Sequence, residues 1–164
     1  MFNRGRPVCC AALGAILAAA AVADSLAAAP AKDNDPLLIG SKWAGKLTQR
    51  GTFSGGGAGP PEFEVVLAVT KRDDNSFEAE LREKAPSLKI TYLVKGKIAR
   101  TAGGKSYAVT FQSYDFKDVE STTPLIGIPY SATLAGKSMK GSWKLSRADE
   151  EIDIAGDFSL ELTK

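Results

Sequence analysis

Residues 130–145, YSATLAGKSMKGSWKL, decide the fold of this chain. Apolar or small residues alternate with polar ones on both sides of a glycine turn: Tyr130, Ala132 and Leu134 before it, and Met139, Gly141, Trp143 and Leu145 after it. Alternation with a period of two on both sides of such a turn predicts a β-hairpin with one apolar face.

The same unit recurs along the chain, over residues 40–50, 62–71, 76–83, 87–100, 106–114 and 152–162. With the hairpin, these segments make about eight strands. Strands that each return beside the last form an antiparallel meander, and closing it into a barrel removes the exposed sheet edges. We therefore predict an all-β protein, a single up-and-down barrel. A two-sheet sandwich is the alternative, but it usually needs longer crossing connections.

The N-terminal residues have the composition of a targeting segment. Arg4 and Arg6 precede an alanine-rich apolar run over residues 8–23, and small residues follow it. This pattern predicts a signal peptide over residues 1–29, a flexible leader over residues 30–39 and the barrel domain over residues 40–164. The protein is then exported, to a periplasmic or extracellular space. A retained anchor is the alternative, but the run is shorter than the roughly 20 residues that span a membrane.

Composition excludes several classes of function. Histidine is absent, and both cysteines, Cys9 and Cys10, fall in the predicted signal peptide. Ser-His-Asp and Cys-His arrangements therefore cannot form in the exported part. The carboxylate pairs Glu62/Glu64 and Glu78/Glu80 fall on the predicted outer face. We expect a protein that is not an enzyme and holds neither a metal nor a cofactor.

Charge also limits the partners. Cleavage after Ala23 removes Arg4 and Arg6 and leaves 19 basic residues against 19 acidic ones. A nucleic-acid partner needs a basic face, so we expect none. Lysines at positions 140 and 144 alternate with the apolar residues, and a lysine facing lipid at the bilayer midplane costs about 2–4 kcal/mol. The apolar face is therefore expected to point inward, with no membrane insertion after cleavage.

Loop lengths divide the predicted barrel into two ends. Connections over residues 51–61, 84–86, 115–128 and 146–151 lie at one end, which we call the loop-rich end. Turns over residues 72–75, 101–105 and 135–137 lie at the other, the closed end, where Trp43 is expected as a plug. Binding sites usually lie among the longer loops of a scaffold, so we expect a ligand at the loop-rich end.

An eight-stranded barrel is just wide enough to be filled by its own side chains or to hold one small ligand. The candidate ligand-binding residues are those whose parity points them inward: Phe63, Tyr92, Phe111, Ser113, Tyr130 and Trp143. Small inward residues, such as Gly45 and Ala79, either interleave with these rings or leave a void. Parity alone leaves both outcomes open.

The chain resembles the calycin group of barrels, lipocalins and avidins, over the whole predicted domain. The domain opens on Gly40-Ser41-Lys42-Trp43, the stretch at residues 142–145 looks like the tryptophan-bearing strand of avidins, and Gly156-Asp157-Phe158 is similar to their closing stretch. The resemblance implies an eight-stranded barrel. It does not imply biotin binding, because the ligand-binding asparagine of that family falls near Gly45, which has no side chain.

These observations lead to two functional hypotheses. The first is an exported, soluble, non-catalytic barrel that binds a small, mostly apolar molecule at its loop-rich end. The second is a filled barrel without an internal ligand, which contacts a protein partner through the loops at residues 51–61 and 115–128. An interior cavity above roughly 300 Å³ favours the first hypothesis, and a filled interior favours the second.

Overall fold

The computed structural model describes residues 36–53, 57–120 and 124–163. The predicted signal peptide lies outside these residues. The strands are β1 (Lys42–Thr48), β2 (Arg50–Thr52), β3 (Glu62–Asp73), β4 (Ser76–Ala85), β5 (Leu88–Arg100), β6 (Tyr107–Glu120), β7 (Pro129–Ala135), β8 (Ser138–Arg147) and β9 (Ile152–Thr163). A single 3-10 turn over Ala148–Glu150, η2, separates β8 from β9 in this part of the chain.

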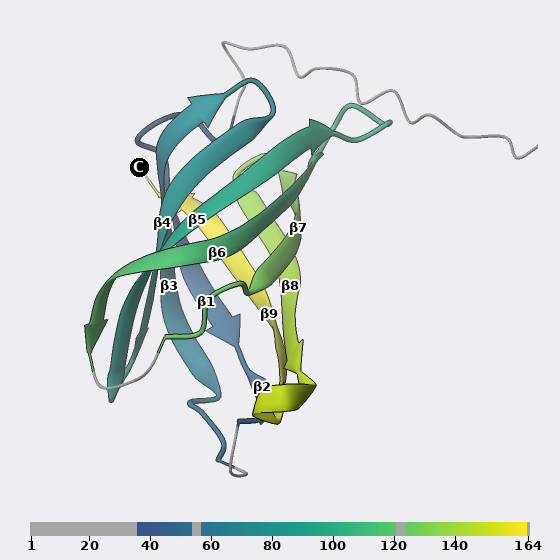
Figure 1. The fold of residues 1–164 in the computed structure, drawn as a ribbon. Coiled ribbons are helices and arrows are strands. Elements are labelled where there is room, and N and C mark those ends of the chain that lie inside the picture. The colour runs from purple at the N-terminus through teal and green to yellow at the C-terminus, as the bar shows by residue number, and fades with distance from the viewer. Residues whose placement is uncertain (1–35, 54–56, 121–123, 164) are drawn as a thin grey trace, which may run out of the picture.

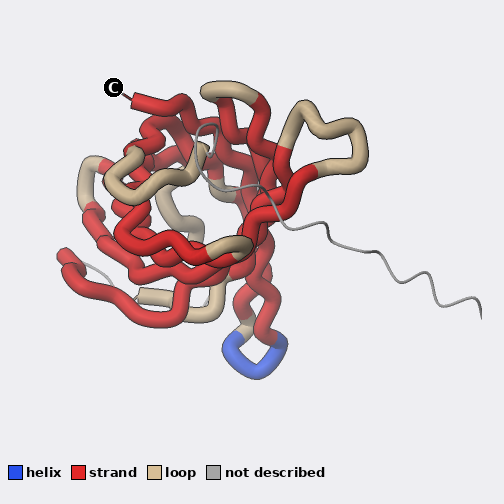
Figure 2. Tube along the Cα trace, turned by 90° about the horizontal axis from the view of Figure 1, so that it is seen from above, coloured by secondary structure: helices blue, strands red, loops and turns tan. Residues whose placement is uncertain are grey.

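The strands close into an antiparallel barrel (Figure 1). From β3 to β9, each strand pairs with the one that follows it in sequence, and β1 pairs with both β3 and β9. The first and last strands meet at Trp43 and Leu162, which are register partners. Figure 2 shows the resulting ring of strands seen along the barrel. The predicted meander barrel is confirmed, and the sandwich alternative is excluded.

The predicted hairpin at residues 130–145 forms, with a turn at Gly136-Lys137 between β7 and β8. Tyr130 pairs with Trp143, and Leu134 pairs with Met139. The same alternation holds around the ring: Phe77 and Leu81 are 3% and 1% exposed. Because successive side chains of a strand point to opposite faces, the apolar set of every strand meets inside the barrel.

The outer face carries cross-strand ion pairs. Lys46 pairs with Glu62 at 2.7 Å between Nζ and Oε1, and Lys71 pairs with Glu78 at 2.9 Å. These pairs are exposed, so each adds about 0–1 kcal/mol to stability. Within the described residues, no helix has the length and apolar character to cross a membrane.

The closed end is sealed by more than the expected plug. Trp43 is fully buried, and so is Leu37, which belongs to the last residues of the predicted leader. The backbone N–H of Gly40 donates to the Val69 carbonyl at 2.9 Å, and this bond holds the segment against the end of β3. Leu37 is therefore part of the hydrophobic core.

Strand extends into several of the predicted loops, most of all into two of them. Residues 115–120 were expected to be a loop but form the second half of β6, with Asp115 opposite Leu93 and Glu120 opposite Lys89. The expected loop at residues 51–61 begins with strand β2, which pairs with β9. The pairing of β6 with β5 shifts register twice, and each shift leaves one extra residue on β6, namely Tyr114 and Lys117. Such bulges bend a strand without ending it, so β5 and β6 stay paired over residues 115–120. These shifts hide the alternation that would reveal the strand.

Candidate functional site

A cavity of about 290 Å³ lies inside the barrel at the loop-rich end. Its walls come from β3, β4, β5, β7, β8 and β9, and its mouth from the loops after β2, β4 and β6. The lining residues are Gln49, Phe53, Gly57, Ala58, Gly59, Pro60, Phe63, Glu83, Ser87, Leu88, Ile90, Tyr92, Leu125, Ile128, Tyr130, Trp143 and Ile154. The lining is mostly apolar and contains neither lysine nor arginine.

Glu83 is the one ionisable carboxyl group in this lining. It lies on β4 with the same parity as Phe77 and Leu81, so its side chain points into the barrel. Its register partners are Val65 and Ile90, both buried. The residue is only 7% exposed. An acidic side chain thus occupies a position that the strand pattern otherwise gives to apolar residues.

The Glu83 carboxylate lies near two phenol side chains, one from β7 across the barrel and one from the neighbouring strand β5. The Tyr130 hydroxyl donates a hydrogen bond to Glu83 Oε1 at 3.2 Å. Tyr92, on β5, is close enough for the Glu83 charge to raise the pKa of its hydroxyl. The same hydroxyl is hydrogen-bonded to the backbone of Leu125. Within the described residues, Glu83 has no cationic partner. The cavity therefore contains a buried acid with a single side-chain donor.

Burial changes the acidity of these groups. Removal from water raises the pKa of Glu83 from 4.5 to about 7, and the Tyr130 hydrogen bond opposes part of that rise. Burial is the largest cause that raises the pKa of Tyr92 and of Tyr130 above the usual value of 10.0, and the nearby Glu83 charge raises both further. Both phenols are therefore neutral near pH 7, whereas Glu83 changes its charge there.

Packed aromatic rings form the floor of the cavity. The ring of Phe111 stacks on Tyr130, with centroids 4.6 Å apart and an interplanar angle of 7°. Phe158 meets both rings edge-on, at 6.0 Å from Phe111 and 6.1 Å from Tyr130. Offset and edge-on pairs of this kind stabilise a core beyond simple burial. The middle of the barrel is filled, and space is left above this layer.

The six candidate residues from the sequence divide into two groups. Four of them line the cavity, namely Phe63, Tyr92, Tyr130 and Trp143. The other two are buried outside it: Phe111 belongs to the floor, and Ser113 accepts a hydrogen bond from the Ile128 N–H at 3.0 Å. Ser113 thus satisfies its hydroxyl by fixing the loop that precedes β7.

Sequence reasoning missed Glu83. The alternation of β4 was recognised through Phe77, Ala79 and Leu81, and the next position of the same parity is residue 83. That parity was the available signal. The predicted strand ends at residue 83, so this position reads as the start of a loop, whereas β4 continues to Ala85.

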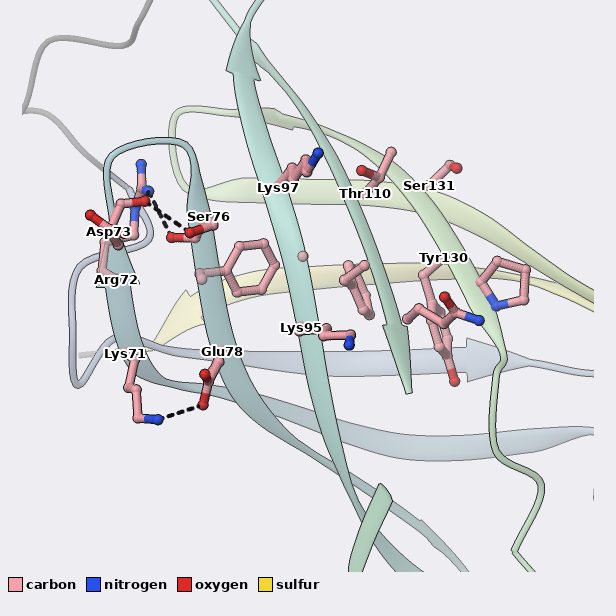
Figure 3. A pocket seen from close by; sticks show the side chains of 15 residues that line it. Lys71, Arg72, Asp73, Ser76, Glu78, Lys95, Lys97, Thr110, Tyr130 and Ser131 are labelled. Atoms are coloured by element: carbon pink, nitrogen blue, oxygen red, sulfur yellow. Dashed lines mark hydrogen bonds and ion pairs between the residues drawn. The ribbon is translucent and has the colours of Figure 1, made fainter. Parts of the chain in front are cut away.

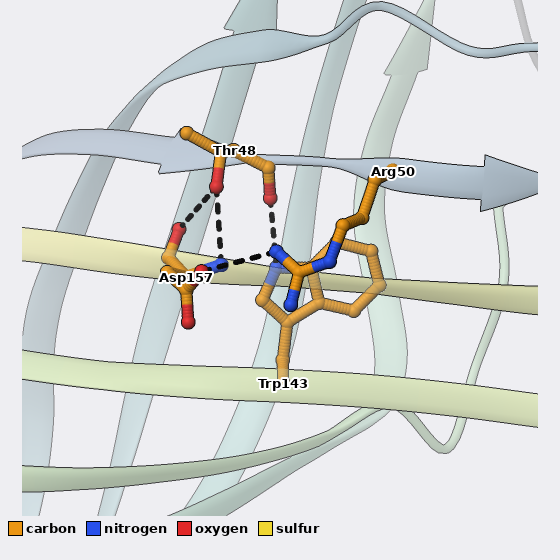
Figure 4. A network of polar contacts seen from close by, with 4 residues as sticks. All are labelled: Thr48, Arg50, Trp143 and Asp157. Atoms are coloured by element: carbon orange, nitrogen blue, oxygen red, sulfur yellow. Dashed lines mark hydrogen bonds and ion pairs between the residues drawn. The ribbon is translucent and has the colours of Figure 1, made fainter.

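Two sets of hydrogen bonds hold the cavity mouth, one on the strand wall and one on the loop before β7. Trp143 Nε1 donates to the Thr48 carbonyl at 3.2 Å, across Gly156 (Figure 4). The Thr48 carbonyl lies at the break between β1 and β2, where the strand-to-strand hydrogen bonds are interrupted. The indole N–H therefore satisfies a carbonyl that a backbone N–H would otherwise pair with. The Thr48 hydroxyl exchanges hydrogen bonds with the Asp157 backbone, and Arg50 pairs with the Asp157 carboxylate at 3.1 Å. This network fixes the wall that carries Trp143.

On the loop side, Arg147 donates to the Ile126 carbonyl, and Gln112 donates to the Gly127 carbonyl at 3.1 Å. The loop that carries Leu125 and Ile128 is therefore held from β6 and β8 at once. This bonding places the two apolar side chains over the cavity.

A second hollow, of about 820 Å³, lies on the surface near the closed end and over β4 to β7 (Figure 3). Three of the four cations in its lining have partners among the described residues. Lys71 pairs with Glu78, Arg72 donates to the Asp73 and Ser76 carbonyls, and the Lys95 ammonium lies 5.3 Å from the centre of the Tyr114 ring. The hollow is an open, charged depression rather than an enclosed pocket.

The cavity lining contains few polar groups. Within the described residues, no three acidic, histidine or cysteine side chains come together as metal ligands. The cavity offers one carboxyl group and two neutral phenols inside an apolar wall, a lining suited to a small molecule with one polar group.

No family model matches the chain, and no curated protein is similar to it. The closed antiparallel barrel is the part of the calycin resemblance that the structure bears out.

Proposed function

We propose that this protein is an exported, non-catalytic barrel that binds a small, mostly apolar molecule in the cavity at its loop-rich end. One observation carries the proposal: a mostly apolar cavity of about 290 Å³ lies where the barrel wall meets three loops, and a buried carboxyl group lies inside it. Binding sites typically combine an apolar wall with a few convergent polar groups.

The size of the cavity bears on the filled-barrel alternative. The cavity, at about 290 Å³, falls just below the roughly 300 Å³ above which volume alone favours the ligand hypothesis, and the ligand proposal rests on its lining as well. The aromatic floor lies below the cavity, so the space is confined to the loop-rich end. This favours a compact ligand with one ring system over a long chain.

Uptake of a neutral hydrophobic dye, such as Nile red, by the folded protein tests the proposal. Leu88→Trp adds an indole at the cavity rim, where Leu88 is half-buried, and is expected to reduce dye fluorescence. Leu38→Trp is the matched control, because Leu38 is 51% exposed in the leader segment at the closed end. Equal dye uptake by both variants, or none by the wild type, contradicts the proposal.

Export is part of the same proposal. It is supported by the basic start and the apolar run in residues 1–29. Mass spectrometry of the protein recovered from the periplasm or the medium is expected to give a chain that begins after Ala23 or Ala29. A full-length chain in the cytoplasm contradicts export.

A contact with a protein partner is the second candidate function. The outer half of β6 presents Tyr114 and Phe116, which are 41% and 40% exposed. β6 pairs with β7 only as far as Gln112, so among the described residues no strand covers the outer edge of the segment that follows. Chemical crosslinking in the native compartment is expected to join a partner to wild type but not to Phe116→Lys. A crosslink that persists in Phe116→Lys excludes this surface.

A further inference from the structure

We infer that Glu83 selects the ligand, and that the ligand class is an apolar amine whose protonated nitrogen pairs with the Glu83 carboxylate. The inference rests on the proposed function, because it assigns a chemistry to the occupant of the same cavity. Three observations carry it: the position of Glu83, the composition of the cavity wall and the limited hydrogen bonding of the carboxylate.

The position of Glu83 is the first observation. Its side chain enters the cavity from β4, while Tyr130 reaches the same point from β7, on the opposite side of the ring of strands. The carboxyl group therefore lies inside the cavity rather than at its rim. A ligand that fills the space above the aromatic floor contacts this group.

The composition of the wall is the second observation. Seventeen residues line the cavity, and Glu83 is the one acidic side chain among them, with no lysine or arginine. The wall therefore has nothing to balance the charge of an anionic ligand, and a second negative charge beside Glu83 is unfavourable. A cationic nitrogen supplies the missing countercharge, and an ion pair is strongest where water is excluded.

The hydrogen bonding of Glu83 is the third observation. An ionised carboxylate has about four acceptor sites on its two oxygens. Tyr130 is the single side chain among the described residues that donates to it, through Oε1. An ammonium group, with up to three donors, can satisfy the remaining sites, whereas an ether or a ketone offers no donor at all.

A purely structural role for Glu83 does not explain this arrangement well. A leucine at residue 83 would continue the apolar face of β4, and a buried acid without a cation is costly for the fold. A binding role explains why the protein carries this destabilising side chain. The carboxylate is already removed from water and held by Tyr130, so little reorganisation accompanies ion pairing with a ligand.

Three probes of equal shape distinguish the ligand classes: 1-naphthylmethylamine, 1-naphthalenemethanol and 1-naphthoic acid, titrated calorimetrically into the intact exported protein at pH 8. We expect the amine to bind about tenfold more tightly than the alcohol, and the acid to bind most weakly. Glu83→Gln is expected to remove the preference for the amine, so that the amine and the alcohol bind with similar affinity. Glu64→Gln is the matched control on the outer face, where the Glu64 side chain is 78% exposed, and is expected to keep it.

The outcomes separate the two proposals. If the alcohol and the amine bind equally to wild type, or if Glu83→Gln keeps the preference, the amine assignment is overturned while ligand binding stands. If the acid binds most tightly, Glu83 acts as a protonated donor and the assignment is likewise overturned. If no probe binds and the dye is excluded, the proposed function itself fails. Circular dichroism of Glu83→Gln verifies folding.

Discussion

The Tyr130 hydroxyl donates a hydrogen bond to Glu83 Oε1 at 3.2 Å across the interior of the barrel. The two residues are 47 positions apart and lie on strands that do not pair with each other. Their contact links the packed aromatic floor to the one acidic group of the cavity. It makes the cavity sensitive to pH and to substitution at either residue.

The first prediction concerns pH and stability. The pKa of Glu83 is raised from 4.5 to about 7 in the folded protein, so folding favours its neutral form. The contribution of neutral Glu83 is fully present below about pH 4.5 and is lost as pH rises through 7. We expect Glu83→Gln, which stays neutral, to be more stable than wild type at pH 8 by about 2–3 kcal/mol.

Urea denaturation of both proteins from pH 4 to pH 8 provides the measurement. The groups that face Glu83 are Tyr92 on β5 and Tyr130 on β7, whose raised pKa values keep them neutral throughout. The stability difference between the two proteins therefore reports Glu83 alone. A difference that stays constant across this range contradicts the raised pKa.

The second prediction concerns Tyr130→Phe. The substitution removes the hydroxyl but keeps the ring that stacks on Phe111. The Tyr130 hydrogen bond lowers the pKa of Glu83, so its loss is expected to raise that pKa further. Stability falls by about 1 kcal/mol near pH 8, where the carboxylate has lost its donor, and by less near pH 4. Infrared titration of the carboxyl band checks the direction, and an unchanged titration midpoint argues against the contact.

The third prediction concerns Gly156. A methyl group at this position would overlap the Thr48 carbonyl and lie 2.6 Å from Trp143 Nε1. Gly156→Ala must therefore break the Trp143–Thr48 hydrogen bond or move the strand, and we expect a loss of about 1–3 kcal/mol. A shifted tryptophan emission spectrum accompanies it. Gly103→Ala is the matched control, since a methyl group there meets nothing within 4 Å. Equal thermal stability of the two variants would contradict the predicted clash at Gly156.

The fourth prediction concerns the segment before β1. Leu37 is fully buried, whereas its neighbour Leu38 is 51% exposed. Leu37→Ala is expected to cost about 2–4 kcal/mol of unfolding free energy, and Leu38→Ala less than about 0.5 kcal/mol. Chemical denaturation of the pair checks the difference. Similar midpoints for both variants would place Leu37 outside the core.

The sequence by itself determined which side chains face the interior and where the long loops gather. Both follow from local features, a period of two along each strand and glycine or proline between strands, which are readable without knowing which strands are neighbours. The hairpin at residues 130–145 shows this most clearly, since Tyr130, Leu134 and Trp143 are buried as their parity predicts.

Only the tertiary structure decided what the interior contains. The space at the loop-rich end depends on how rings from distant strands share volume, as Phe111 and Tyr130 do when they stack. The Glu83–Tyr130 contact, the burial of Leu37 and the pairing of residues 115–120 with β5 likewise join segments whose local patterns do not refer to each other. A cavity is a property of packing in three dimensions, and a one-dimensional alternation cannot specify whether the volume it encloses is full.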